Sequence, residues 1–242
     1  MADLVMFPRQ KPEWLSWSLV YRVTRLLRLL FGAERLARLC LNLEWMTWRL
    51  AYELSGEVFG ARLVNEAYGV TRELLKTHVP CGSVVIDVGC GAGRVAALVP
   101  PGTRYIGLDR NVQALTLARV SYPGTRFVRH NLESDWADGL SGDVGLCIGV
   151  LEHLDDPLAL LSTLRSVVRV LIVEVPDSEA HALNWARQRL GCRWYSDDDH
   201  VREYTPTLLE AHIRQAGWVP AQWVQRSGMV LVVAKRDGDG AK

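Results

Sequence analysis

Two spacings of apolar residues predict where the helices and strands of this chain lie. Over residues 14–55 the apolar positions recur at the spacing of amphipathic helices, and a break near Gly32 divides the segment into two helices. A further helix is predicted at about 62–77, before Pro80 and Gly82. The apolar positions of the first segment include Leu26, Leu27, Leu30, Leu36, Leu39, Leu43 and Met46. We therefore expect residues 1–78 to form a helical extension or cap.

From residue 84 onward, short apolar runs rich in β-branched residues alternate with helical segments. Strands are predicted at 84–88, 104–109, 126–130, 143–150, 170–175, 218–226 and 229–235. Helices are predicted around 95–99, 113–121, 158–167 and 204–216. Because strands separated by helices pair in parallel, residues 79–236 should form an α/β, Rossmann-like, doubly wound domain. Its seven-stranded sheet would be mostly parallel and end in an antiparallel hairpin, and the tail at 237–242 should be disordered.

Composition and charge narrow the class of protein. The chain has 242 residues, 49% hydrophobic and 23% charged, which is typical of a soluble globular protein. Its net charge of +1 gives no reason to expect a DNA partner. Five cysteines without a C-x-x-C pair argue against a disulfide framework or a structural zinc site. With neither an apolar run long enough to span a membrane nor a signal-peptide pattern, a cytoplasmic protein is expected.

The most informative motif follows the first predicted strand. Gly89, Gly91 and Gly93 stand where a parallel strand opens into a ligand crevice, and glycine lets a ligand approach the backbone closely. A dinucleotide fingerprint would need its third glycine at Arg94. With Asp87 ahead of the glycines, the run resembles the first motif of class I S-adenosylmethionine (SAM)-dependent methyltransferases. That resemblance extends over about residues 84–235.

The ends of the next two strands carry polar residues that fit the same cofactor. Asp109 lies 16 positions beyond Gly93, and its carboxylate can accept hydrogen bonds from both ribose hydroxyls, although Asp also favours a helix N-cap. Asn131 stands where the family often has Asp. Its amide oxygen can accept from the adenine amino group or cap the loop, and Leu132 would flank the adenine.

The resemblance implies SAM as the cofactor and a binding site along these strand ends. Asp87 would hold a water or the ammonium group of the cofactor, and Arg94 either contacts its carboxylate or covers the helix start. The residues predicted to bind SAM are Asp87, Gly89, Cys90, Gly91, Gly93, Asp109, Arg110, Asn131, Leu132, Ile148 and Gly149.

Two histidines are candidate catalytic residues. The run V-L-E-H-L-x-D-P at 150–157 resembles the small-molecule subgroup of the family, including the ubiquinone-biosynthesis type, and places His153 near the transferred methyl group. His200 begins an H-x-x-x-Y-T element that often precedes the last helix in that subgroup. Either could accept a proton from an oxygen acceptor. Alternatively, His153 is a hydrogen-bonded loop residue and His200 an anchor paired with an Asp. Asp197–Asp199 is interpreted as a solvated loop, so no metal site is predicted.

Two further segments leave alternatives open. Residues 176–199 contain tryptophans and arginines that suit a lid over an anionic substrate or a helix packed on the N-terminal region. Residues 14–50 combine Trp14, Trp17, Trp45 and Trp48 with Arg25, Arg28, Arg35 and Arg38. Such a segment can cap the substrate pocket, which is the interpretation favoured here, or make peripheral contact with an anionic membrane.

The sequence therefore predicts a SAM-dependent methyltransferase with a small-molecule acceptor. The subgroup resemblance favours transfer to oxygen on a sugar, quinone-like or lipid-linked metabolite. Methylation of RNA or protein, and a non-catalytic SAM-binding module, are the alternatives. The N/D-P-P-Y/F run of amino-methylating DNA enzymes is replaced here by Gly149-Val150-Leu151-Glu152.

Overall fold

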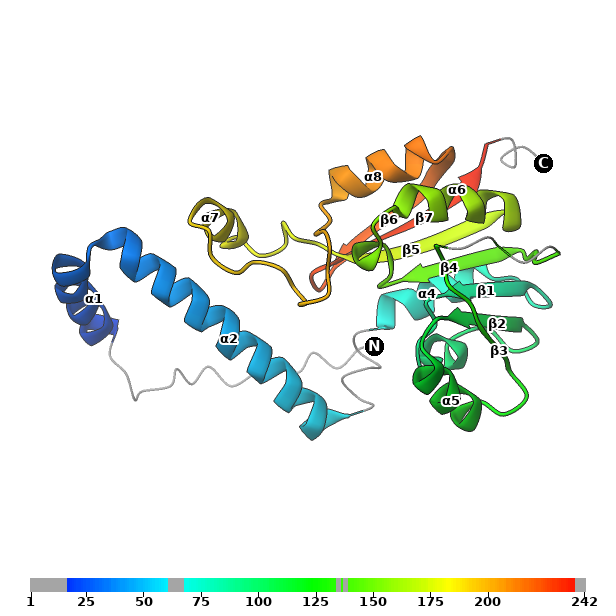
Figure 1. Ribbon diagram of the computed structural model, residues 1–242, viewed down its shortest axis with the longest axis horizontal. Helices are drawn as coiled ribbons and strands as arrows, with labels where there is room; N and C mark the ends of the chain where they lie inside the picture. The colour runs from blue at the N-terminus through cyan, green and yellow to red at the C-terminus, as the bar shows by residue number, and fades with distance from the viewer. Residues whose placement is uncertain (1–16, 61–67, 134–135, 137–138, 238–242) are drawn as a thin grey trace, which may run out of the picture.

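A computed structural model describes residues 17–60, 68–133, 136 and 139–237. Its centre is one seven-stranded sheet in the order β3-β2-β1-β4-β5-β7-β6 (Figure 1). The strands are β1 (Val84–Val88), β2 (Arg104–Asp109), β3 (Arg126–Arg129), β4 (Val144–Ile148), β5 (Val170–Pro176), β6 (Trp218–Arg226) and β7 (Met229–Arg236). The first five pair in parallel, and β7 is antiparallel to both β5 and β6. The predicted fold class is confirmed.

Helices cover both faces of the sheet, which is why the central strands are apolar on both sides. On one face α6 (Pro157–Val167) and α8 (Pro206–Gln215) bury Leu161 and Leu209 against the sheet. On the other face α4 (Gly69–His78) and α5 (Val112–Ser121) bury Leu75 and Leu115. Because these strands pair in parallel, the carboxyl ends of β1, β2, β4 and β5 lie along the same edge of the sheet. The SAM site was predicted at this edge.

Side-chain caps fix the starts of α6 and α8. The Asp156 side chain accepts from the backbone N–H of Ala159, and the Thr205 side chain accepts from Leu208 at 3.1 Å. Each cap is followed by a proline in the first turn, where a missing N–H costs nothing. Thr205 is therefore the N-cap of α8.

Some predicted elements differ from the structure. The helix expected at 95–99 is only a short 3-10 helix, η1 (Arg94–Ala97). The glycine loop therefore leads into a single tight turn, not into an alanine-rich α-helix. Of the helix expected at 62–77, the structure describes the part that belongs to α4, because residues 61–67 lie outside the described residues. Trp14 and the tail from residue 238 also lie outside them.

Two N-terminal helices extend away from the sheet (Figure 1). They are α1 (Trp17–Phe31) and α2 (Ala33–Phe59), with the predicted break at Gly32. Leu41 is the one α2 residue classed as buried, and α2 contacts the segment around α7 (Asn184–Arg189) through an Arg187–Glu44 ion pair. Residues 176–199 thus pack on the N-terminal region, which was the alternative to a lid over the substrate. Within the described residues, no helix is both long and apolar enough to cross a bilayer.

Candidate active site

Two cavities meet at Gly89 on the carboxyl edge of the sheet. The first, of about 210 Å³, is lined by Gly89, Asp109, Arg110, Asn131, Leu132, Gly149 and His153 among others. The second, of about 250 Å³, is lined by residues that include Asp87, Gly89, Cys90, Gly91 and Ile148. Ten of the eleven residues predicted to bind SAM therefore line one cavity or the other. These ten residues lie close together because neighbouring parallel strands end at the same edge of the sheet.

The glycine loop is shaped by backbone that other residues rarely adopt. Gly89 has φ +69°, and a Cβ built there would lie 2.5 Å from Cγ2 of Val150. Gly93 has φ +77°, and its Cβ would lie 2.9 Å from Cζ of Phe127. Gly89 is therefore needed for the close approach of the loop to the segment after β4. Gly93, the predicted SAM residue outside the two cavity linings, is explained by packing against Phe127.

Asp109 ties the end of β2 to the glycine loop. One carboxylate oxygen accepts from the N–H of Gly91 and the other from the N–H of Asn111, both at 2.7 Å. Asn111, not Asp109, caps α5, because its side chain accepts from the backbone of Gln113 and Ala114. The alternative of Asp109 as a helix N-cap is therefore wrong, and its carboxylate lies against the first cavity.

Asn131 caps the loop after β3, and its predicted contact with adenine remains a prediction. Its Oδ1 accepts from the backbone N–H of Glu133 at 3.3 Å, which caps the loop after β3. It also lines the first cavity together with Leu132. The geometry therefore leaves the amide beside the space where an adenine ring would lie.

Three buried carboxyl groups gather at the ends of β1, β4 and β5. Asp87, Glu152 and Glu174 are 2%, 2% and 6% exposed. Burial raises the pKa of Asp87 and of Glu152 to about 7 and also raises the pKa of Glu174. Asp87 accepts a hydrogen bond from the Tyr105 hydroxyl. None of the ion pairs found among the described residues includes any of these three groups.

This concentration of buried acid fits the cofactor. SAM carries a sulfonium and an ammonium group, so its positive charge would offset carboxyl groups that form no ion pair within the described part of the chain. Asp87 lines the second cavity, next to the glycine loop. The residues present therefore suit a cationic ligand at this edge of the sheet.

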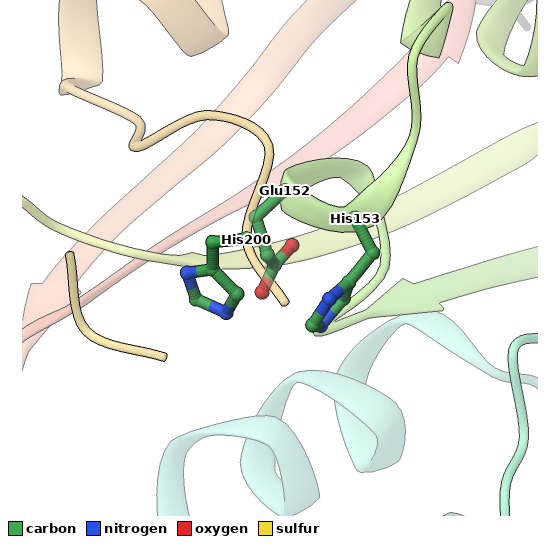
Figure 2. A group of neighbouring side chains, drawn as sticks. All are labelled: Glu152, His153 and His200. Carbon is green, nitrogen blue, oxygen red and sulfur yellow. The ribbon is translucent and has the colours of Figure 1, made fainter. Parts of the chain in front are cut away.

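The two predicted catalytic histidines lie side by side (Figure 2). His153 lies in η2 (Leu151–His153) just after β4, and His200 lies in the loop before α8. Their ring centroids are 4.7 Å apart, with the rings nearly perpendicular. The carboxylate of Glu152 lies beside both rings, and His153 lines the first cavity. The fold thus joins two residues that are far apart in the sequence.

His200 is held by a partner that the sequence did not reveal. Its Nδ1 lies 3.0 Å from Oε1 of Glu203, whose oxygens also accept from the hydroxyl of Ser196. Burial lowers the pKa of His200, but the hydrogen bond and charge of Glu203 raise it more, so the net shift is upward. The expected Asp partner is therefore wrong. The closeness of Glu203 to His200 in the sequence, three residues away, was the available signal.

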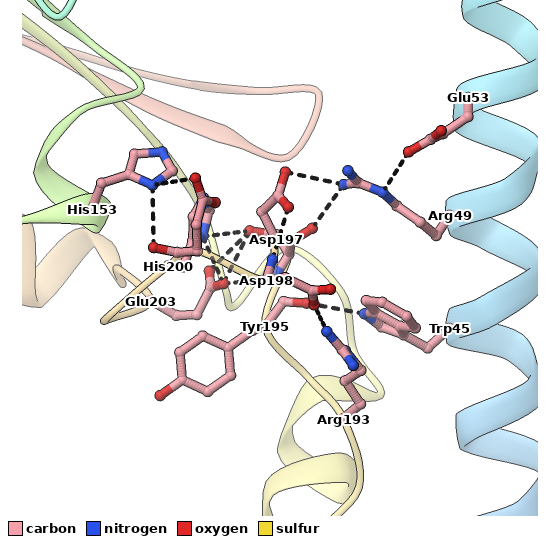
Figure 3. A network of polar contacts seen from close by, with 12 residues as sticks. Trp45, Arg49, Glu53, His153, Arg193, Tyr195, Asp197, Asp198, His200 and Glu203 are labelled. Atoms are coloured by element: carbon pink, nitrogen blue, oxygen red, sulfur yellow. Dashed lines mark hydrogen bonds and ion pairs between the residues drawn. The ribbon is translucent and has the colours of Figure 1, made fainter. Parts of the chain in front are cut away.

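The loop that carries His200 is fastened to α2 (Figure 3). The indole N–H of Trp45 donates to the backbone carbonyl of Tyr195 at 3.0 Å, and Arg49 pairs with Asp197 at 3.2 Å. Arg193 pairs with Asp198 and lies over the Trp45 ring. The acidic triplet is therefore not simply solvated: two of its members form ion pairs, and Asp199 lies 3.4 Å from His153.

Comparison with known proteins identifies the family of this site. A family model described as a methyltransferase domain matches residues 62–222. This chain belongs to the methyltransferase-domain family. It is a SAM-dependent methyltransferase, so the predicted enzyme class, cofactor and family are confirmed.

Similar proteins span several acceptors. The trans-aconitate 2-methyltransferase of Azoarcus sp. (strain BH72) is 28% identical over 198 residues, covering 69% of this chain and 77% of that protein. The ubiquinone biosynthesis O-methyltransferase of Thiobacillus denitrificans is 35% identical over 100 residues, covering 38% of this chain and 43% of that protein. Magnesium protoporphyrin IX methyltransferase from Synechocystis PCC 6803, solved with SAH, has the same fold. It matches with a TM-score of 0.58 at 19% identity, covering 85% of this chain and 100% of that one.

Proposed function

We propose that this methyltransferase transfers the methyl group of SAM to a hydroxyl oxygen of a small molecule. The observation that carries the proposal is the pairing of His153 and His200 beside the first cavity, with rings 4.7 Å apart. An oxygen acceptor of high pKa needs a group that takes its proton, and two adjacent imidazoles supply one. The names of two similar proteins, with trans-aconitate and ubiquinone biosynthesis as their context, also point to small acceptors.

The cavity residues are assigned the following binding roles. When bound, SAM supplies a methyl group on a sulfonium that is already a good leaving group. Asp109 and Arg110 would contact the ribose, and Asn131 and Leu132 the adenine. The turn formed by Gly89, Cys90, Gly91 and Gly93, with Asp87, Ile148 and Gly149, would hold the methionine end. The protein then has to align the acceptor and exclude water.

His153 and His200 would have different roles in removing the proton from the acceptor hydroxyl. His153 lines the first cavity, so it would touch the acceptor hydroxyl directly. His200 lies next to His153 and against Glu203, whose hydrogen bond and charge raise the pKa of His200 and favour a bound proton. The proton would leave the hydroxyl as the methyl group arrives.

The N-terminal helices would hold the His200 loop in place and bring the enzyme to a membrane that contains the acceptor. We assign residues 17–60 to the helical extension, and α4, which buries Leu75 against the sheet, to the SAM-binding domain together with residues 79–236. This moves the boundary expected at residue 78 toward the N-terminus. The contacts of Trp45 and Arg49 to the His200 loop join the two parts. The helix α1 contains Arg22, Arg25 and Arg28 and no acidic residue, and it exposes Leu26, Leu29 and Leu30. A basic amphipathic helix of this kind would bind an anionic membrane and bring the enzyme to a lipid-linked acceptor.

The test of this function separates cofactor binding from turnover. We expect His153→Ala and His200→Ala to bind SAM with nearly unchanged affinity by calorimetry while methylating a hydroxylated acceptor more slowly, by about 10²–10⁴-fold for the residue that accepts the proton. Equal rates in both variants and the parent would contradict acid–base catalysis. Faster methylation of RNA or protein than of any small hydroxylated compound would favour the alternative acceptors.

A further inference from the structure

Three potential metal ligands converge at the acceptor side of the site (Figure 2). Glu152 and His153 come from η2, and His200 comes from the loop before α8. One ligand atom from each of the three side chains lies within 4.8 Å of the others. Ligands on a common divalent ion approach one another in this way, because each one lies about 2 Å from the metal.

Glu152 has an oxygen that the protein leaves unsatisfied. The residue is 2% exposed, and its Oε2 has no hydrogen-bond partner among the described residues. A buried polar atom without a partner costs folding free energy, so it calls for a ligand, an ion or a water. The unsatisfied oxygen belongs to the same carboxylate that faces the two imidazoles.

Both imidazoles are oriented through one ring nitrogen. Nδ1 of His200 lies 3.0 Å from Oε1 of Glu203. Nδ1 of His153 lies 3.4 Å from both the backbone oxygen and a carboxylate oxygen of Asp199. Metal-binding histidines characteristically engage a carboxylate or carbonyl with one nitrogen and the ion with the other. Among the described residues no hydrogen bond is found to Nε2 of either ring, so each Nε2 can serve as a ligand.

We propose that Glu152, His153 and His200 bind a divalent transition-metal ion such as Mn²⁺, Fe²⁺ or Zn²⁺. Two imidazoles and one carboxylate form a ligand set with open coordination positions. Imidazole nitrogens favour these ions over Mg²⁺ and Ca²⁺, which prefer oxygen. His153 lines the first cavity, so an open position would face the acceptor. The acidic triplet at 197–199, where a metal was considered from sequence, is a different group of residues.

The inference rests on the proposed function, because the same side chains face the acceptor. A bound ion would coordinate the acceptor oxygen and lower the pKa of its hydroxyl. With an ion bound, the two imidazoles would act as its ligands in place of the proton-accepting role proposed above, and the ion would stabilise the negative oxygen. Glu203 becomes a positioning residue that fixes the His200 ring.

Metal binding can be measured without any acceptor. The full chain is treated with chelator, dialysed, and titrated with Mn²⁺ alone by calorimetry and by electron paramagnetic resonance. We expect one ion per chain, and loss of that site in Glu152→Gln and in His153→Asn. Glu203→Gln should weaken binding by about 10–100-fold, the usual effect of removing the partner of a ligand. His78→Asn is the matched control, because His78 is half-buried, pairs with Gln222 and lies outside the proposed ligand group.

Circular dichroism melting verifies that each variant is folded, and the two ligand variants give independent tests. Absence of stoichiometric Mn²⁺ binding to the parent chain, or binding that survives in both ligand variants, would overturn the metal site. A parallel SAM titration separates the two claims. SAM binding without Mn²⁺ binding removes the metal alone, whereas failure of SAM to bind removes the proposed function as well.

Discussion

Trp45 in α2 donates its indole N–H to the backbone carbonyl of Tyr195, 150 residues later in the chain and 3.0 Å away. Tyr195 lies five residues before His200, in the loop that completes the candidate active site. The N-terminal extension is therefore joined to the loop that carries His200 by a specific hydrogen bond, and Arg49 adds an ion pair to Asp197.

These tethers should affect turnover more than cofactor binding. We expect Trp45→Phe, which keeps an aromatic ring and removes the N–H, to lower kcat by several-fold, because a small displacement of a catalytic group is costly. Arg49→Ala should act in the same direction, and the two changes together should exceed either alone. The affinity for SAM, measured by calorimetry, should change little.

Trp48→Phe provides the matched control for the tether, since Trp48 lies on α2 and is exposed. Its kcat should equal that of the parent. If Trp45→Phe also retained the parent kcat, the contact with Tyr195 would have no role in positioning the catalytic loop.

The carboxylate of Asp109 should be the strongest single contributor to cofactor affinity. Asp109→Ala is expected to weaken SAM binding by about 1.5–3 kcal/mol, the scale for losing charged hydrogen bonds. Part of this loss would come from the Gly91 N–H, which Asp109 now satisfies. Calorimetric titration measures the effect, and an unchanged dissociation constant would remove Asp109 from the ribose site.

Asp87 should lose a proton when the cofactor binds. Burial raises its pKa to about 7, so near neutral pH the carboxyl group is partly protonated. A nearby positive charge lowers the pKa of an acid, so SAM should cause net proton release. Titrations in buffers of different ionisation enthalpy measure that release, which Asp87→Asn should reduce. Equal proton release in both proteins would mean that Asp87 does not sense the charge of the cofactor.

The stability of the protein should record the burial of Glu152. Its pKa is about 7 in the folded protein and near 4.5 when unfolded. At low pH Glu152 is neutral in both the folded and the unfolded chain, so its burial costs no ionisation free energy. As pH rises through about 7 the free energy of unfolding decreases, because the Glu152 carboxyl ionises more easily in the unfolded chain. Relative to the parent, Glu152→Gln should therefore gain about 2–3 kcal/mol between roughly pH 4 and pH 8.

Urea unfolding in the presence of chelator provides this comparison without interference from metal ions. Glu210→Gln, on the exposed side of α8, is a suitable control because its side chain pairs with Arg214 at the surface. Parallel stability profiles for Glu152→Gln and the parent would show that Glu152 ionises normally in the folded chain.

The sequence predicted the sheet and the cofactor edge because both depend on local patterns. Apolar β-branched runs marked each strand, and Asp87, the glycines and Asp109 all lie where strands end. The glycine loop was followed by a shorter helix than expected, since propensity alone does not determine where a turn stops.

The grouping of Glu152, His153 and His200 was harder to predict from the sequence. Their proximity depends on how the loop before α8 returns to the end of β4, which has no periodic signal. One backbone bond that fixes this return runs from the N–H of Val201 to the carbonyl of Glu152 at 2.9 Å. The loop is also fastened by α2, whose contacts span about 150 residues of sequence. Such long-range pairing follows from tertiary packing and could not be deduced from spacing.

The most direct test of the central claim is transfer of an isotope-labelled methyl group from SAM to a defined panel of acceptors. The panel should contain catechols and quinols, sugars, lipid-linked phenols in anionic vesicles, transfer RNA and an unfolded protein, with products identified by mass spectrometry. We predict a methyl ether on a small hydroxylated compound, with lower yield from His200→Ala. Label found only in RNA or protein, or transfer that does not depend on His200 and His153, would contradict it.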